Sequence, residues 1–452
     1  MDLIQYFTRH IVAPVWAAWE GSRYLRHYRR LRRTQFDSPD VIAERQLRGV
    51  QQIVSHAFRT VPYYRHLFDA HDIDPASIRS LSDLHRVPLL TKKDLRDAGT
   101  SLVSQDYPRA ALHEKKTSGS TGVPLRVLLD DAGMQFKRAC TLRADEWSGW
   151  RLGRRVAKVW GNPEYQRLGW RGRLRNSLLD RSTYLDTLRL DESALAEFAE
   201  KLRRRPPSLL FGHAHSLYLF AQYVAARRIR DIQPDSIIAT AMVLHEWQRR
   251  TIEDAFTCRV TNRYGCEEVS LIASECEEHN GLHVNADGLY VEILVNGRPA
   301  AKGDSGAVVV TDLVNRAMPL IRYKVGDVAA MSSRRCGCGR GLPLLERLEG
   351  READYVTTEF GDLVSGISLT ENFAMQVPGV AQLQIIQEAI TRFRFRIVRS
   401  PQFDVKSELQ LGRLVRERFG PNTRYDLEFV DEIPQEASGK YRFCISHVPV
   451  TL

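Results

Sequence analysis

Short apolar runs that alternate with helix-like stretches constrain the fold of this chain more than any other feature of its sequence. The runs at 126–130, 155–161, 208–213 and 236–241 read as buried strands, and a helix-like stretch follows each of them. Such alternation is typical of an α/β architecture in which helices cover a largely parallel sheet. We therefore expect an α/β fold for this part of the chain.

Regions on both sides of this alternation have different patterns. Apolar positions recur at helical spacing over 46–68, where Pro62 interrupts them, so helices are expected there. The stretch 288–300 is predicted to form a β-hairpin that turns at Asn296 and Gly297.

The pattern changes again near residue 350. A chain of 452 residues exceeds the size at which one hydrophobic core keeps growing, so two domains are expected. After residue 350, arginine alternates with apolar residues over 392–397, as in a half-exposed strand, and a helical stretch follows. We predict a large domain at 1–350, which includes a helical region at 1–100, and a small α+β domain at 351–452.

The cysteine content and the lack of a long apolar run predict a cytoplasmic protein, and the charge bears on its partners. Lysine and arginine number 65 against 55 acidic residues, which gives a net charge of +10. The seven cysteines are odd in number and unevenly spaced, which suits a reducing compartment better than a disulfide framework. No apolar run reaches the ~18 to 20 residues of a membrane span.

We expect no nucleic acid partner, because no recognised binding module accompanies the positive charge.

Part of the positive charge lies in one segment near the N-terminus. Six arginines between Arg23 and Arg33 interleave with tyrosines and leucines, a pattern that indicates an amphipathic basic helix. Two interpretations stay open. The helix either packs on its own domain with a solvated basic face, or rests peripherally on an anionic membrane, so the protein is cytoplasmic or membrane-associated.

A segment rich in hydroxyls and glycines, TSGSTGVP at 117–124, is the strongest functional signal. Its glycines free the backbone to wrap N–H groups around an anion, and its hydroxyls add donors. The segment is not a Walker A motif, because no lysine follows the second glycine and Pro124 stands where a helix would begin. The pattern predicts a loop that holds a triphosphate, although alone it also fits an ordinary surface turn.

Four further motifs follow this loop in order. They are RYGCEEVS at 263–270, TDLVNRAMPLIRYKVGDVA at 311–329, LEGREADYV at 348–356 and IPQEASGKYRF at 433–443. Their order and spacing resemble the acyl-adenylate-forming superfamily of ligases, and within it the phenylacetate-CoA ligase-like branch with its CapK-like capsule proteins. The resemblance covers nearly the whole chain. It implies a large N-terminal α/β domain and a small mobile α+β C-terminal domain.

The resemblance also implies how ATP would be held. Tyr264, followed by Gly265, would stack on adenine, and Glu268 would hold Mg²⁺ near the phosphates. Glu267 stands where the family has threonine. The loop residues that would grip the β- and γ-phosphates are Thr117, Ser118, Gly119, Ser120, Thr121 and Gly122.

Charged residues complete the implied site. Asp327 would accept hydrogen bonds from the ribose hydroxyls, with support from Arg322 and Tyr323. Arg351 would contact ribose or phosphate just before an interdomain hinge. Lys440, in the small domain, would reach the α-phosphate and the carboxylate during adenylation.

A separate group of residues suits zinc. Cys276 and His283 precede Cys336 and Cys338, which are one residue apart and flanked by glycines. Three soft thiolates and one imidazole favour a structural tetrahedral Zn²⁺. His279 is the alternative ligand if His283 faces elsewhere, and reduced thiols without a metal are the other interpretation.

The resemblance implies an acyl pocket between the segment 211–216, the stretch 239–243 and the motif of Tyr264 and Gly265. His213, His215 and Ser216 suit a substrate with hydroxyl, amino or ring substituents, or equally are satisfied core residues.

We predict an enzyme that uses ATP and Mg²⁺ to convert a carboxylic acid into an acyl-adenylate with release of pyrophosphate, and then transfers the acyl group to coenzyme A. An amine or hydroxyl of a sugar or amino acid is the alternative acceptor, and transfer of AMP itself to a phenolic acceptor is a further alternative. Glu267 and Ala353 depart from the family pattern. A third alternative is therefore a non-catalytic scaffold that binds a nucleotide.

Overall fold

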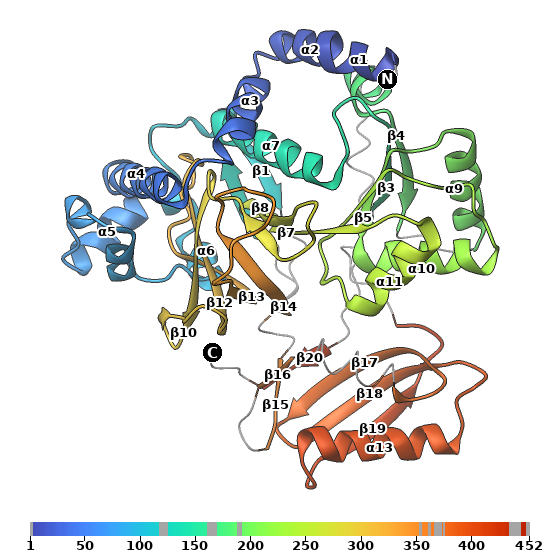
Figure 1. Cartoon of the computed structure of the whole chain (residues 1–452). Coiled ribbons are helices and arrows are strands. Elements are labelled where there is room, and N and C mark those ends of the chain that lie inside the picture. Colours follow the sequence, from blue (N-terminus) through green and yellow to red (C-terminus); the bar gives the residue numbers. More distant parts are fainter. Residues whose placement is uncertain are drawn as a thin grey trace.

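A computed structural model describes residues 3–116, 125–160, 170–187, 192–351, 355–359, 363–365, 373, 376–433 and 444–448. These residues form a large mixed α/β part and, below it in Figure 1, a smaller part built on a separate sheet. The helices are α1 (Leu3–Phe7), α2 (Ala13–Trp19), α3 (Tyr24–Thr34), α4 (Pro39–Thr60), α5 (Pro62–Ala70), α6 (Lys92–Ala98), α7 (Asp131–Asp145), α8 (Trp170–Arg175), α9 (Glu192–Arg204), α10 (Ala214–Ala226), α11 (Glu246–Phe256) and α13 (Val405–Phe419).

One twelve-stranded mixed sheet runs through the large part. In spatial order its strands are β11 (Arg298–Pro299), β10 (Leu289–Val295), β12 (Ser305–Asp312), β13 (Tyr323–Met331), β14 (Leu344–Arg351), β9 (Leu282–Val284), β8 (Ser270–Glu275), β7 (Val260–Cys266), β6 (Ser236–Thr240), β5 (Leu209–His213), β3 (Val156–Trp160) and β4 (Ser182–Asp186). Helices connect the parallel strands β4, β3, β5, β6 and β7, as the alternating pattern predicts. The remaining strands pair antiparallel, because the connections between most of them are too short for a crossover helix.

The strand expected at 126–130 is placed differently from the prediction. It forms β2 (Arg126–Leu129), which pairs antiparallel with β1 (His113–Lys116) in a two-stranded ribbon outside the large sheet. The assignment of this strand to the parallel sheet is therefore wrong. An apolar run shows that a strand is buried, but it does not name the strand's partner.

Local turn signals were read correctly. Helix α4 ends at Thr60 and α5 begins at Pro62, which stands at the first helical position where its missing N–H costs nothing. In the predicted hairpin, Val295 pairs with Arg298. The two turn residues between these partners, Asn296 and Gly297, have positive φ angles of 50° and 76°.

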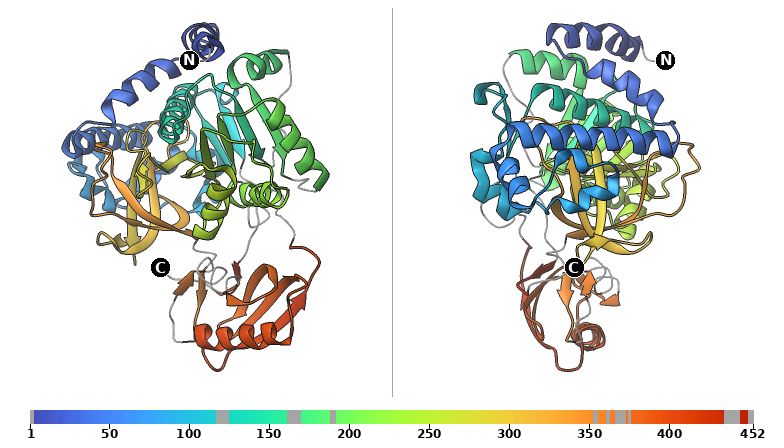
Figure 2. Two further views of the ribbon diagram at one scale, coloured as in Figure 1. Left: turned by 45° about the vertical axis from the view of Figure 1, so that its right-hand side comes forward. Right: turned by 90° about the vertical axis from the view of Figure 1, so that its left-hand side faces the viewer.

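The C-terminal sheet has a hydrophobic core of its own. Its strands, in order, are β19 (Arg424–Phe429), β18 (Arg392–Arg399), β17 (Val380–Ala389) and β20 (Cys444–Ser446), while β15 (Tyr355–Thr357) and β16 (Leu363–Ser365) form a separate pair. Along β18 the phenylalanines are buried and the arginines face outward, as the alternation predicts. Phe393 stacks on Phe419 of α13 with 4.2 Å between ring centroids. Figure 2 shows this sheet at the end of the molecule opposite α1 and α2.

Helix α3 is the basic helix predicted near the N-terminus. Tyr24, Tyr28 and Leu31 are at most 5% exposed, since this face packs on the large part and contacts α7. Arg138 of α7 lies over the Tyr24 ring at 3.9 Å. The interpretation in which α3 packs on its own domain is therefore the one observed, and membrane contact through its apolar face gains no support. In the described part of the chain, no helix combines the length and apolar character needed to cross a membrane.

Candidate active site

The ends of the predicted phosphate loop are held together by the β1–β2 ribbon. Residues 117–124 lie outside the described residues, so their phosphate contacts stay a prediction. The residues just outside the loop are Cα partners in the ribbon at Lys116 and Arg126. The loop therefore starts and ends at one place, as an anion-binding loop needs.

The turn after β7 faces β13 and forms a buried polar cluster. The Tyr264 hydroxyl donates to Asp327 Oδ2 at 2.7 Å, and the Tyr323 hydroxyl donates to Glu268 Oε1 at 3.0 Å. Burial first, and then the neighbouring carboxylate, raises the pKa of both tyrosines, so both remain donors. The structure thus brings Tyr264 and Glu268, which belong to one short motif, together with Asp327, which lies 63 residues beyond Tyr264.

Gly265 allows the backbone of β7 to lie very close to the backbone of the paired strand β8. A Cβ atom at this position would lie 2.4 Å from the carbonyl oxygen of Ser270 on the paired strand. No side chain fits at that distance, so the glycine in the motif has a steric reason.

Lys115 contacts this part of the site although the sequence motifs did not indicate it. Its Nζ donates to Ser270 Oγ at 3.1 Å and lies 3.9 Å from Glu267 Oε2. Burial lowers the pKa of Lys115, and the charge of Glu267 acts in the opposite direction. Its position directly before the glycine-rich loop, in HEKK, was the signal available in the sequence. The contact places the start of the phosphate loop beside the turn that carries Glu267 and Glu268.

Arg322 does not join this cluster. Its guanidinium makes a bidentate pair with Glu292, at 3.1 and 3.0 Å, and donates to the carbonyl oxygens of His85 and Val87. Only 4% of Arg322 is exposed. Direct contact with a nucleotide would require these bonds to break, so Arg322 supports the site by tying β10 to the 85–87 segment.

The side chains of two predicted site residues, Arg351 and Lys440, lie outside the described part of the structure. Arg351 ends β14, where its Cα is the ladder partner of Asp327 in β13, but its side chain is outside the described residues. Lys440 also lies outside them. Their roles stay predictions.

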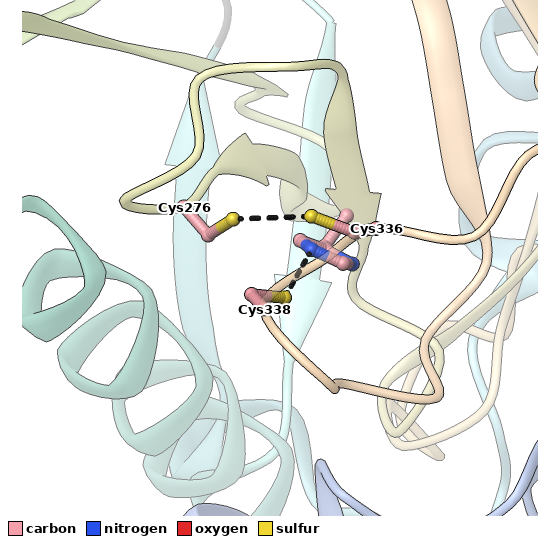
Figure 3. A group of neighbouring side chains, drawn as sticks. Cys276, Cys336 and Cys338 are labelled. Atoms are coloured by element: carbon pink, nitrogen blue, oxygen red, sulfur yellow. Dashed lines mark hydrogen bonds between the residues drawn. The ribbon is translucent and has the colours of Figure 1, made fainter.

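Three cysteines and one histidine converge at a second location. The ligand atoms of Cys276, His283, Cys336 and Cys338 all lie within 4.8 Å of one another. Sγ of Cys276 is 3.6 Å from Sγ of Cys336, and Sγ of Cys338 is 3.2 Å from Nε2 of His283 (Figure 3). These residues come from the loop after β8, from β9 and from the loop between β13 and β14.

The geometry fits a tetrahedral zinc ion. Zn–S bonds of about 2.3 Å place two sulfurs of a tetrahedron about 3.8 Å apart, close to the observed separation and far beyond a disulfide bond. Burial lowers the pKa of His283 to about 4, so its imidazole is neutral, as a ligand must be. His279, the alternative ligand, lies 3.3 Å from Glu275 and is outside the group. Burial alone would raise the pKa of the Cys338 thiol, but hydrogen bonds from Arg340 outweigh burial and lower it. Arg340 thus places a positive charge beside the sulfurs.

The histidines of the expected acyl pocket are buried. His213 is 1% exposed, and its ring lies 4.1 Å from that of Trp160. Burial, and then the charge of His245, lowers the pKa of His215 to about 3, while Gln248 bonds its Nδ1 at 3.1 Å. Its burial and the Gln248 contact at Nδ1 fit the interpretation of His215 as a core residue.

Comparisons with known proteins agree with this arrangement. Residues 356–447 match the CapK C-terminal domain. The chain is 24% identical to Protein CapK of Staphylococcus aureus over 94% of each chain, and 25% identical to phenylacetate-coenzyme A ligase of Thermus thermophilus over 82% of each. The structure of 2-hydroxyisobutyryl-CoA ligase with 2-HIB-AMP matches with a TM-score of 0.72 and 20% identity, covering 89% of this chain and 88% of that one. The chain is therefore similar over most of its length to Protein CapK and to phenylacetate-coenzyme A ligase, and it shares the fold of a CoA ligase that was solved with an acyl-adenylate.

The likeness to the 2-hydroxyisobutyryl-CoA ligase structure extends over 89% of the chain and so over both parts of the architecture. The fold combines a large part around a mixed sheet with a smaller C-terminal part, and the CapK match spans the four-stranded sheet of the latter. The polar cluster of Tyr264, Glu268 and Asp327 lies in the large part, at the junction of β7 and β13.

Proposed function

We propose that this protein is an ATP-dependent ligase that activates a carboxylic acid as an acyl-adenylate, releases pyrophosphate and passes the acyl group to coenzyme A. One observation carries the proposal: the Lys115–Ser270 contact holds the entrance of the phosphate loop beside the turn that carries Glu268, which shares a buried cluster with Asp327. Triphosphate, ribose and metal ligands would thus surround one site.

Each group has a chemical task in this proposal. Asp327 would accept the ribose hydroxyls, and Tyr264 would hold the Asp327 carboxylate in place and offer its ring to adenine. Glu268 would hold Mg²⁺, whose charge offsets that of the phosphates. Lys440 would enter from the small domain, after a hinge that we place near residue 351. Positioning and charge compensation supply most of the rate in such transfers.

The acceptor has a second candidate. The match to Protein CapK covers 94% of both chains, and the capsule-type resemblance allows an amine or hydroxyl of a sugar or amino acid to take the acyl group. The product would then be an amide or ester, formed without coenzyme A.

We propose that the cluster of Cys276, His283, Cys336 and Cys338 binds a structural zinc ion. Four protein ligands fill a tetrahedral shell, which leaves no position for water or substrate. The ion would join the loops of β8, β9 and the β13–β14 connection.

The function is tested by pyrophosphate release from ATP and Mg²⁺ over a panel of aryl, fatty, hydroxy and amino acids, with and without coenzyme A. We expect release that depends on the acid, and a thioester product when coenzyme A is present. Lys440→Ala should remove release, whereas the control Lys406→Ala, on exposed α13, should retain it. Acid-dependent release with no thioester, but with an amide or ester from an added amine or hydroxyl, would select the second acceptor. Equal release by Lys440→Ala and wild type would reject the proposed mechanism.

A further inference from the structure

The first helices of the chain carry an exposed apolar stripe. Leu3, Phe7, Ile11, Val15 and Trp19 follow one another at intervals of four residues and are between 46% and 77% exposed. Four residues overshoot one α-helical turn of 3.6, so such a spacing would normally drift around the helix. The π-helical turn at Thr8–Val12 is wider and reverses this drift, which keeps the stripe on one side.

A second stripe of the same design lies beside the first. Trp170, Leu174 and Leu178 are also four residues apart and 66%, 40% and 41% exposed. They lie on α8 and on a second π-helical turn, Asn176–Asp180. The Trp19 and Trp170 rings are 6.3 Å apart, so the two stripes form one surface, which we call the apolar platform.

The opposite side of these helices anchors the platform to the protein. Gln5, Thr8, Ala13 and Trp16 are at most 9% exposed, and Ala13 and Trp16 form a small core with Leu179. Thr8 Oγ1 also donates to the carbonyl oxygen of Leu178 at 3.4 Å. The apolar side chains outside therefore face solvent while the packing surface of the same helices is already occupied.

Positive charge adjoins the platform. Helix α2 ends at Trp19, and α3 begins at Tyr24 with a row of exposed arginines. The one acidic residue between 3 and 34, Glu20, lies 3.8 Å from Arg138. Within the part of the chain that the structure describes, no ion pair is formed by the exposed arginines Arg23, Arg26, Arg29, Arg30 and Arg33.

The platform lies at the end of the molecule farthest from the C-terminal sheet. In both views of Figure 2, α1, α2 and α8 are at the top and the C-terminal sheet is at the bottom. A flat partner at the platform would therefore leave the small domain and the polar cluster of the active site unobstructed.

We propose that the apolar platform docks the protein on the surface of an anionic lipid bilayer. Apolar and tryptophan side chains would enter the headgroup region, and the arginines of α3 would bind lipid phosphates. Three features together favour a bilayer over a protein partner. Five arginines of the 23–33 segment have no ion pair among the described residues, and residues 3–34 contain one acid. Tryptophans lie at the platform, and its large apolar side chains are exposed. This contact uses α1, α2 and α8 and not the apolar face of α3, which is buried.

The test is sedimentation of the full chain with vesicles of phosphatidylcholine, alone or with about one third phosphatidylglycerol. The variant Phe7→Glu/Val15→Glu is compared with Val405→Glu/Leu409→Glu, which alters two exposed apolar residues of α13 by the same charge. A third variant, Arg26→Gln/Arg29→Gln, weakens the basic row. Thermal unfolding shows that each variant is folded.

We expect wild type and the α13 control to bind anionic vesicles, and the platform variant to partition at least about tenfold less. The arginine variant should lose its preference for anionic over neutral vesicles. Absence of wild-type binding, or equal binding by the platform variant and its control, would overturn the proposal. A third result would also overturn the proposal. If wild type self-associates without lipid, and Phe7→Glu/Val15→Glu abolishes this self-association but still binds vesicles, the platform binds a second copy of the chain.

Discussion

At the residue scale, the candidate active site depends on contacts between residues that no local pattern connects. The Tyr264–Asp327 and Tyr323–Glu268 bonds join segments about sixty residues apart in the chain. Motifs predict roles for Tyr264, Glu268 and Asp327, and they predict that Tyr323 supports Asp327, whereas the Tyr323 hydroxyl donates to Glu268. Arg322 shows the opposite case: its place in a motif suggested a nucleotide contact, whereas Glu292 and two carbonyl groups engage it.

Lys115 provides a prediction about pH. Its lowered pKa means that its charge is lost, as pH rises, below the ordinary lysine value of 10.5. If Lys115 supports the triphosphate, ATP affinity should fall over the same alkaline range. Lys115→Arg should keep affinity at high pH, and Lys115→Met should weaken ATP binding roughly tenfold at neutral pH.

Calorimetric titration with ATP and Mg²⁺ measures both effects. Arg126→Met, an exposed residue at the other end of the loop, serves as a charge-matched control. The same alkaline loss in Lys115→Arg and wild type would show that another group titrates.

At the element scale, short-range signals were reliable and strand partners were not. The break at Pro62 and the turn at Asn296 and Gly297 follow from backbone chemistry within a few residues. The strand at 126–129 was recognised, yet its pairing with β1 depends on the whole domain. The cysteine and histidine ligands were recognisable because soft ligands at close spacing are chemically distinctive.

The cluster of Cys276, His283, Cys336 and Cys338 predicts one zinc ion per chain that stabilises the centre of the large sheet. Cys338→Ser should remove the metal and lower Tm by about 5 °C or more, because the loops of three neighbouring strands lose their shared ligand. Elemental analysis and thermal unfolding give the two readings. Cys258→Ser, which changes a thiol outside the cluster, should retain both. A full zinc content in Cys338→Ser would refute the assignment.

At the scale of the whole molecule, the separate hydrophobic core of the C-terminal sheet predicts two units of stability. The core of the C-terminal sheet, built around Phe393 and Phe419, is separate from the cores of the large part. The change of pattern near residue 350 indicates this second unit in the sequence. No local sequence pattern predicts how the two units are placed relative to each other.

Phe393→Ala should destabilise the C-terminal unit by about 3 to 5 kcal/mol, since it leaves a cavity against Phe419. Hydrogen exchange read by mass spectrometry should rise in β17, β18 and α13, with strands β5 to β7 unchanged. Arg392→Ala, on the exposed side of the same strand, should alter neither region strongly. Equal loss of protection in both units would mean that they unfold together.

Adenylation of a carboxylic acid at the cluster of Tyr264, Glu268 and Asp327 is the central step of the proposed function. Exchange of labelled pyrophosphate into ATP, without coenzyme A, tests this half-reaction alone because it requires a reversible acyl-adenylate. We predict exchange that depends on the acid and on Mg²⁺, and that falls at least about a hundredfold in Asp327→Ala. An acid-dependent turnover that yields ADP and phosphate, or nucleotide binding without exchange for any acid in the panel, would contradict the account.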